Sequence, residues 1–263
     1  MKPTIRALLL AAGMGTRLKP LTDYWPKCLM PIGGRPLLEY WLQTLRGAGI
    51  NDVLVNTHYQ SDKVLKFLAR EQFEGWVQVV HEKHLLGTAG TLRANSAFFQ
   101  DGVALLIHAD NWCQCDFNAF VQYHLQLRPK YCAITMMTFD TDTPQSCGIV
   151  EVDGDGVVLG FHEKVANPPG KRANAAVYML EPEVLKWLNE NQAITDFSTQ
   201  VLPNFIGRIA TWQNSGVHRD IGTVEALRAA QGDPLPELLW SDGDQWSRDF
   251  KSSQTFASLA SSL

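Results

Sequence analysis

Residues 5–18 constrain the fold more strongly than any other part of this sequence. An apolar run over residues 5–12 leads directly into a loop that reads Gly-Met-Gly-Thr-Arg-Leu at residues 13–18. The run is typical of a buried strand, and a strand that ends in Gly-x-Gly exposes backbone N–H groups with no Cβ to block an anion. Arg17 and Lys27 add positive charge in and after this loop. The segment therefore predicts a loop that binds the phosphates of a nucleotide.

Two common glycine loops do not fit the spacing. A dinucleotide-binding fingerprint requires a third glycine three residues after the second, where this chain has Leu18, and Pro20 stands where its helix would run. A Walker A loop ends in Gly-Lys-Ser or Gly-Lys-Thr, and the sequence contains no such segment. These mismatches disfavour both a dinucleotide-dependent oxidoreductase and a P-loop enzyme.

Composition limits the class of protein. The 263 residues are 45% hydrophobic, which suits one large α/β domain. The net charge of −4, without a basic stripe, gives no electrostatic footprint for a nucleic acid. No apolar run approaches the roughly 20 residues of a membrane span, so we expect a soluble, cytoplasmic protein with no membrane partner. Cys113 and Cys115 lack a second close pair, which favours reduced thiols over a zinc site or disulfides.

Strand-like and helix-like segments alternate along the chain. We expect strands at residues 5–12, 52–56, 76–80, 103–107 and 174–178, helices after Pro36 and at 61–70 and 91–99, and a hairpin at 148–161. This order predicts an α/β fold with a doubly wound, mostly parallel, Rossmann-like mixed sheet flanked by helices. Ligands of such sheets bind beyond the carboxyl ends of the strands, so Asp110, which follows the strand at 103–107, is a candidate metal ligand.

The motifs taken together resemble those of the sugar-1-phosphate nucleotidyltransferases, such as mannose-1-phosphate guanylyltransferases and glucose-1-phosphate thymidylyltransferases. The resemblance rests on Leu-Ala-Ala-Gly-Met-Gly-Thr-Arg-Leu-Lys-Pro-Leu-Thr, then Pro-Lys-Cys-Leu at 26–29, then Pro-Ile-Gly-Gly-Arg-Pro-Leu-Leu at 31–38. It implies the nucleotide-diphospho-sugar transferase fold. It also implies a reaction that joins a nucleoside triphosphate to a sugar-1-phosphate, with Mg²⁺ as cofactor and a homo-oligomer as an open option.

The resemblance assigns roles to residues of this chain. The catalytic residues would be Arg17 on the β- and γ-phosphates, Lys27 on the α-phosphate, and Asp110, which would share Mg²⁺ with Asp220. The nucleotide would contact Leu10, Ala11, Ala12, Gly13, Gly15, Thr16, Arg17, Lys27, Glu82, Leu86, Gly87 and Ala109. The sugar phosphate would contact Asn111, Gly148, Glu163, Lys164 and Asn174.

The chain departs from the family pattern at Ala109 and Ala176, where the family usually has glycine. We expect one nucleotidyltransferase domain at residues 1–232, with a nucleotide-binding half at about 1–130 and a sugar-binding half at about 131–232. Residues 233–263 would form a C-terminal surface segment or tail. We also expect a strand that ends near Trp212, followed by a short loop, to bring Asp220 to the ligand-binding edge of the sheet.

Glu82 bears on the choice of base. A carboxylate only accepts hydrogen bonds, and guanine offers two adjacent donors where uracil and thymine offer one. The leading expectation is therefore GTP with mannose- or heptose-1-phosphate. One alternative is a UTP- or dTTP-dependent enzyme acting on a hexose-1-phosphate, including N-acetylmuramate-1-phosphate. Another is a catalytically silent nucleotide-sugar sensor, although such a sensor would be expected to lose one of its four charged site residues.

Overall fold

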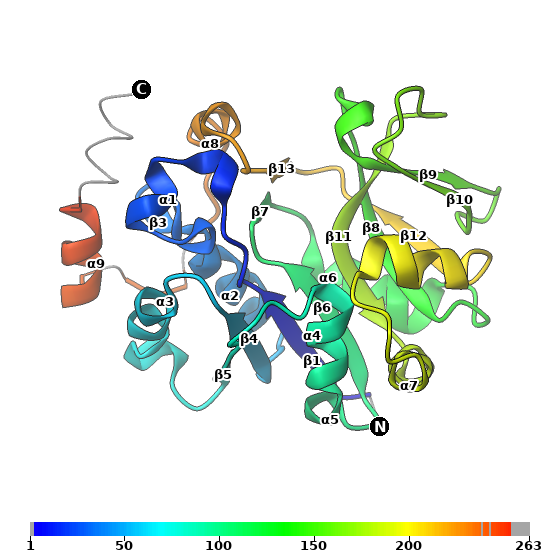
Figure 1. The fold of residues 1–263 in the computed structure, drawn as a ribbon, viewed down its shortest axis with the longest axis horizontal. Coiled ribbons are helices and arrows are strands. Elements are labelled where there is room, and N and C mark those ends of the chain that lie inside the picture. The colour runs from blue at the N-terminus through cyan, green and yellow to red at the C-terminus, as the bar shows by residue number, and fades with distance from the viewer. Residues whose placement is uncertain (1–2, 238, 242, 254–263) are drawn as a thin grey trace. The chain divides into compact units, whose positions relative to one another are not determined.

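The computed structural model describes residues 3–237, 239–241 and 243–253 of the chain. They form two compact units that interleave in sequence (Figure 1). Unit 1 contains residues 3–8, 85–107 and 115–216, and unit 2 contains residues 9–84, 108–114 and the described residues from 217 onward. Within the described part of the chain, none of the helices combines the length and apolar character that a bilayer crossing requires.

Unit 2 is built on parallel strands and covering helices. Strand β1 (Ile5–Leu10) begins in unit 1 and ends in unit 2, while β4 (Val53–Thr57) and β5 (Val77–His81) pair in parallel. The α-helices are α1 (Leu21–Tyr24), α2 (Leu37–Gly47), α3 (Ser61–Leu68), α8 (Val224–Ala230) and α9 (Gln245–Lys251). Short 3-10 turns lie at Thr16–Leu18 (η1), Lys27–Leu29 (η2) and Glu71–Phe73 (η3). Two small ribbons pair β2 (Pro31–Ile32) with β3 (Arg35–Pro36) and β7 (Asn111–Cys113) with β13 (His218–Asp220).

Unit 1 holds the mixed part of the sheet, with the order β10-β9-β11-β6 and with β8 paired to both β11 and β12. These strands are β6 (Val103–His108), β8 (Ile134–Asp140), β9 (Gly148–Val152), β10 (Val158–Glu163), β11 (Arg172–Leu180) and β12 (Ile209–Gln213). Because β6, β8 and β9 are all antiparallel to β11, and β12 is parallel to β8, these four strands run in one direction. The α-helices are α4 (Thr88–Ala94), α5 (Ser96–Phe99), α6 (Phe117–Gln122) and α7 (Pro182–Glu190). Single π-helical turns lie at Tyr123–Leu127 (η4) and Phe197–Val201 (η6), and 3-10 turns lie at Pro144–Ser146 (η5) and Leu202–Phe205 (η7).

The expected α/β fold with a mixed, mostly parallel sheet flanked by helices is confirmed. Two local expectations differ from the structure. The first strand ends at Leu10, two residues earlier than expected. The helix expected at 91–99 is two helices, because Asn95 ends α4 and its side-chain amide donates to the Thr91 carbonyl at 2.8 Å. The strand expected to end near Trp212 is β12, which ends at Gln213, and a short loop leads from it to β13, which carries Asp220 and pairs with β7.

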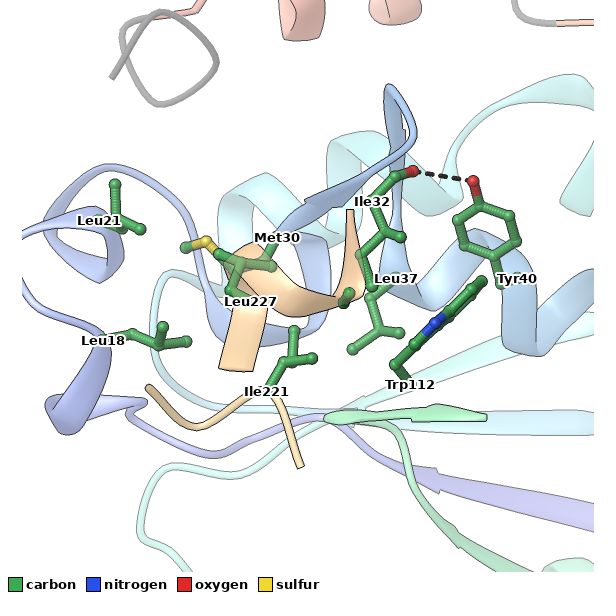
Figure 2. Packing of buried hydrophobic residues seen from close by; sticks show 10 residues of the cluster. Leu18, Leu21, Met30, Ile32, Leu37, Tyr40, Trp112, Ile221 and Leu227 are labelled. Atoms are coloured by element: carbon green, nitrogen blue, oxygen red, sulfur yellow. Dashed lines mark hydrogen bonds between the residues drawn. The ribbon is translucent and has the colours of Figure 1, made fainter. Parts of the chain in front are cut away.

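One apolar cluster of unit 2 lies among the segments that carry the charged candidate residues (Figure 2). Leu18, Met30 and Ile221 are completely buried in it, and Trp112 fills its side nearest Tyr40. The Tyr40 hydroxyl donates to the Ile32 carbonyl at 2.8 Å. Burial of such side chains is the main source of folding free energy. The cluster therefore fixes backbone that directly flanks Arg17 and Asp220 and lies within three residues of Lys27 and Asp110.

The first part of the C-terminal segment packs on unit 2. Arg70 donates to Asp244 at 2.7 Å and to Ser247 at 3.1 Å, and it forms an ion pair with buried Glu39. Trp246 and Phe250 of α9 stack on each other and both contact Trp25 edge to face. Described residues after position 233 therefore contact the rest of unit 2, and the division of the chain at residue 233 stays a prediction. Residues 254–263 of the expected tail lie outside the described residues.

We expect Phe250→Ala to lower the free energy of unfolding by about 3 kcal/mol, because it empties a buried aromatic site between Trp25 and Trp246. Urea unfolding of the purified protein measures this. Asp249→Ala, at an exposed position of the same helix, should change it by less than about 0.5 kcal/mol. Equal losses in both variants would show that α9 does not contribute through this contact.

Candidate functional site

The glycine loop after β1 is open at one position and tightly packed at another. A Cβ at Gly13 would have no atom within 4 Å, so this backbone is free to approach a ligand. Gly15 has a φ of 59°, and a Cβ there would lie 2.8 Å from Thr22 Cγ2 and 3.1 Å from Lys27 Cβ. The Thr22 hydroxyl also donates to the Gly15 carbonyl at 3.0 Å. The second glycine therefore lets the loop pack against the segment that carries Lys27.

Four charged side chains meet beside this loop. The Lys27 ammonium donates to Asp110 Oδ2 at 2.8 Å and to Asp220 Oδ1 at 2.6 Å. Arg17 Nη2 lies 3.2 Å from Asp220 Oδ2. The Lys27 side chain is only 6% exposed, whereas Asp110 and Asp220 are 36% and 51% exposed. The site thus presents two accessible carboxylates joined through one buried cation.

The contacts in this cluster shift the pKa values of Lys27 and Asp220 in the directions that favour their charged forms. Burial lowers the pKa of Lys27, but the Asp110 and Asp220 carboxylates outweigh burial and hold the pKa above its usual value. Burial raises the pKa of Asp220, but Lys27 and Arg17 outweigh it and the net pKa is below the usual value. Burial also raises the pKa of the neighbouring Cys28 thiol to about 12, so Cys28 stays protonated and is a poor nucleophile.

The ribbon β7–β13 positions the two aspartates. Asp220 pairs with Asn111, the residue that follows Asp110. Asp233 holds this ribbon from the side, because its carboxylate accepts two hydrogen bonds from Arg219 at 2.6 and 2.8 Å and one from the Trp112 indole at 3.0 Å. A bidentate arginine–carboxylate pair fixes orientation as well as distance. A Cβ at position 222 would lie 2.6 Å from Arg17 Nη2, so a larger residue there would displace the exposed end of the Arg17 side chain.

The oxygen donors suit a hard divalent cation. Asp110 and Asp220 direct one oxygen each at a single point, which the Lys27 ammonium marks. Mg²⁺ in enzymes is commonly bound by one or two carboxylates, with water and substrate phosphates as its other ligands. Among the residues that the structure describes, no group of three or more histidine, cysteine, aspartate or glutamate side chains could hold a metal ion. The two carboxylates therefore fit a site that substrate oxygens would complete.

Glu82 is connected to the glycine loop through Asn56. The Asn56 amide donates to Glu82 Oε1 at 3.0 Å, and its carbonyl oxygen accepts from the Ala11 N–H at 2.8 Å. Glu82 is only 5% exposed, and its backbone carbonyl oxygen lies 2.8 Å from His58 Nδ1. Position 82 therefore presents a carboxylate of fixed orientation in the unit that contains the loop.

The other residues assigned to the nucleotide fall in both units. Leu10 ends β1, Ala11 and Ala12 are buried after it, and the Ala109 N–H donates to the Leu10 carbonyl at 3.1 Å. Ala109 does not adopt a positive φ, so glycine is not required there. Thr16 begins η1. Leu86 and Gly87 belong to unit 1, where a Cβ at Gly87 would lie 2.5 Å from the Thr195 carbonyl. Their nucleotide contacts stay predictions.

Three of the residues assigned to the sugar phosphate lie on β9, β10 and β11 of unit 1, and a fourth, Lys164, directly follows β10. Glu163 pairs with Gly148, and a Cβ at Gly148 would lie 2.6 Å from Glu163 Oε2. Lys164 Nζ lies 3.5 Å from Glu163 Oε1. The Asn174 amide donates to the Tyr178 hydroxyl at 2.6 Å. The fifth residue, Asn111, lies in unit 2. A common role for these residues in sugar binding stays a prediction.

Ala176 lies in the left-handed region, with a φ of 56°. The pairing of β11 with β8 shifts register between Asn174 and Tyr178, so Ala176 sits in a bulge, and its N–H donates to Asn174 Oδ1 at 2.9 Å. Left-handed backbone favours glycine, which explains the glycine that the family usually has here. Alanine is accommodated, and the bulge directs Asn174 toward Tyr178.

Several supporting residues could not be inferred from the motifs. Asn56, Thr22 and Asp233 connect the candidate residues to the framework, and each acts through a hydrogen bond over at least seven positions of sequence. The signal available for Asn56 was a polar residue near the end of an otherwise apolar strand. Nothing comparable marks Asp233, whose partners Trp112 and Arg219 lie on different strands.

Comparison with known proteins identifies the family. Residues 6–235 match the model of the nucleotidyl transferase family. The chain belongs to this family. The match includes the glycine loop, Lys27 and both aspartates, and it ends two residues after Asp233.

Individual relatives agree with this assignment. A Mycobacterium tuberculosis mannose-1-phosphate guanylyltransferase is 26% identical over 256 residues, which cover 93% of this chain and 70% of that protein. A Sulfolobus acidocaldarius protein assigned as a mannose-1-phosphate guanyltransferase is 27% identical, over 83% of this chain and 60% of its own length. The chain thus spans roughly two thirds of these curated relatives. A solved structure from Bacillus anthracis is assigned as a glucose-1-phosphate thymidylyltransferase. The match covers 89% of this chain and 98% of that one, and the two share the fold with a TM-score of 0.76 at 21% identity.

We expect Gly15→Ala to lower the free energy of unfolding by about 1–3 kcal/mol, because it combines left-handed backbone with a contact against Thr22. Chemical unfolding without ligand measures the change. Gly13→Ala is the matched control and should change it by less than about 0.5 kcal/mol, since its Cβ would meet nothing. Similar losses in the two variants would contradict the packing role given to Gly15.

Proposed function

We propose that this protein joins a nucleoside triphosphate to a sugar-1-phosphate, forming a nucleoside-diphosphate sugar and releasing pyrophosphate. One observation carries the proposal most strongly: three contacts, Asp110–Lys27, Lys27–Asp220 and Asp220–Arg17, link four charged side chains beside the open glycine loop. Membership of the nucleotidyl transferase family supports the same reaction. A silent sensor on this fold would have no need for all four groups.

The residues have distinct tasks in this reaction. An oxygen of the sugar phosphate attacks the α-phosphorus of the triphosphate, a new P–O bond forms, and the bond to the pyrophosphate oxygen breaks. Backbone N–H groups of the glycine loop bind the triphosphate, and Arg17 neutralises its β- and γ-phosphates. Lys27 stabilises the charge that develops on the α-phosphate. Positive charge placed in advance where negative charge develops is commonly the largest catalytic contribution.

Asp110 and Asp220 would hold Mg²⁺, which when bound supplies positive charge to the phosphate oxygens of both substrates. The support for this cofactor is the donor set itself, two accessible carboxylates directed at one point. The protein's own part is to hold both carboxylates in position and to favour the ionised form of Asp220. The low pKa of Asp220 and the ribbon β7–β13 serve these two needs.

The favoured substrates are GTP and mannose-1-phosphate, with heptose-1-phosphate as a second sugar. The names of the curated relatives support guanine and mannose. The fixed carboxylate of Glu82 independently supports guanine, because it can accept from the two adjacent donors of that base. UTP or dTTP with a hexose-1-phosphate is the alternative pair. We place the reaction in the cytoplasm, where both classes of substrate are soluble metabolites.

Pyrophosphate release with Mg²⁺ tests the function directly. GTP, UTP, dTTP, CTP and ATP are each combined with mannose-, glucose-, N-acetylmuramic acid- and heptose-1-phosphate. We expect release with GTP and one sugar phosphate, reduced about 100-fold or more in Lys27→Ala and in Arg17→Ala. Lys19→Ala is the control, since Lys19 is exposed and pairs with Asp23. If no substrate pair gives pyrophosphate release and the protein still binds a nucleotide sugar, the result would favour the catalytically silent sensor over the enzyme.

Glu82→Gln tests the choice of base. The two side chains have the same shape, and glutamine can still accept from Asn56, so the fold should be kept. A hydrogen bond to a charged group contributes about 1.5–3 kcal/mol, so the preference for GTP over UTP should fall by roughly 10- to 100-fold. The ratio of kcat/KM for the two nucleotides measures it. An unchanged ratio would remove Glu82 from base recognition.

A further inference from the structure

The four charged side chains of the site have no net charge when taken together. Lys27 and Arg17 contribute two positive charges, and Asp110 and Asp220 contribute two negative ones, all joined by contacts of 2.6 to 3.2 Å. The groups suited to phosphate are therefore paired with the groups suited to a metal ion. A phosphate that binds Lys27 or Arg17, or a metal ion that binds the carboxylate oxygens these cations contact, must change a contact between the protein's own side chains.

Lys27 is the residue whose contacts a metal ion on the two carboxylates would change most directly. Its ammonium contacts Asp110 Oδ2 and Asp220 Oδ1 together, so it lies where a cation shared by both carboxylates would lie. The Lys27 side chain is 6% exposed, so water screens its charge poorly. Arg17 contacts Asp220 at 3.2 Å, and its side chain is 67% exposed.

We propose that Lys27 is an internal competitor of the divalent cation: its ammonium and the metal ion contend for the same oxygens of Asp110 and Asp220. The inference rests on the proposed function, because it uses the same carboxylates as metal ligands. The residue that stabilises the α-phosphate during the reaction thus weakens metal binding before the nucleotide arrives. Phosphate binding to Lys27 releases the carboxylates, and metal binding to the carboxylates releases Lys27.

The sign of the effect separates this idea from a purely supportive role for Lys27. If Lys27 only held the carboxylates in place, its removal would weaken metal binding or leave it unchanged. If it competes, its removal tightens metal binding even though catalysis is lost. Coupling between two sites in a protein is typically about 5- to 150-fold, so we expect the dissociation constant of the metal to fall roughly tenfold.

The test uses the full chain and Mn²⁺ alone, without nucleotide, and free Mn²⁺ is measured by electron paramagnetic resonance. Lys27→Met removes the charge and keeps a side chain of similar length, and Lys27→Arg keeps the charge. Lys19→Ala changes the net charge equally but removes a residue that pairs with Asp23 instead. We expect about tenfold tighter binding in Lys27→Met, and less than a twofold change in Lys27→Arg and Lys19→Ala.

A second measurement uses the wild-type protein and so does not depend on how a variant folds. An amine-reactive label is applied with and without Mg²⁺, and the rate at each lysine is read by mass spectrometry. Displacement of Lys27 from the carboxylates should raise its labelling several-fold, while Lys19 serves as the internal reference. Equal labelling of Lys27 with and without Mg²⁺ would overturn the proposal, as would unchanged or weaker Mn²⁺ binding in Lys27→Met.

One more variant distinguishes failure of this proposal from failure of the metal site. Asp110→Asn with Asp220→Asn, added to Lys27→Met, should abolish the Mn²⁺ binding. If binding persists, the metal lies elsewhere, and both the competition and the metal ligands of the proposed function are wrong. If the triple variant loses Mn²⁺ binding but Lys27→Met alone binds Mn²⁺ no more tightly than the wild-type protein, only the proposed competition is wrong.

Discussion

The site depends on the two hydrogen bonds that the Lys27 ammonium donates, one to Asp110 and one to Asp220. These three residues lie far apart in sequence and enter from η2, from the turn before β7 and from β13. Drawing a lysine almost completely out of water is costly unless its partners are held at hydrogen-bond distance. The packing of unit 2 must therefore fix three separate backbone segments at once.

The apolar cluster and the polar contacts around it meet this requirement. Leu18, Met30 and Ile221 anchor backbone close to Arg17, Lys27 and Asp220. Asp233 restrains the ribbon through Arg219 and Trp112. Trp25, two residues before Lys27, packs against α9. Precise sites need side chains whose supports are themselves fixed, and here the supports extend to the C-terminal segment.

Much of the fold and of the charged cluster could be predicted from the sequence, because the signals are local or follow from strand topology. The glycine loop carries its own pattern, and Asp110 directly follows an apolar strand. The strand pairing that positions Asp220 could not be predicted from the same signals. The ribbon β7–β13 is three residues long on each strand and pairs segments more than a hundred residues apart, so neither periodicity nor turn chemistry marks it.

The break between α4 and α5 at Asn95 and the bulge at Ala176 could not be predicted from the sequence for a related reason. Each depends on one side chain that competes with regular backbone hydrogen bonding, Asn95 at the Thr91 carbonyl and Asn174 at the Ala176 N–H. The surrounding apolar pattern continues through both places. The sugar-binding assignments in unit 1 and the nucleotide contacts of Leu86 and Gly87 stay predictions.

The ribbon also bears on which ions the two carboxylates accept. Asp110 adjoins Asn111, and Asn111 is the strand partner of Asp220, so the separation of the carboxylates is set by one antiparallel pairing. A separation fixed by such short-range geometry adapts poorly to ions of different radius. Mg²⁺ demands short, near-octahedral oxygen contacts, whereas Ca²⁺ tolerates longer and more irregular ones. In the proposed metal site the ribbon would therefore select ions by their radius, independently of the charge that the site presents.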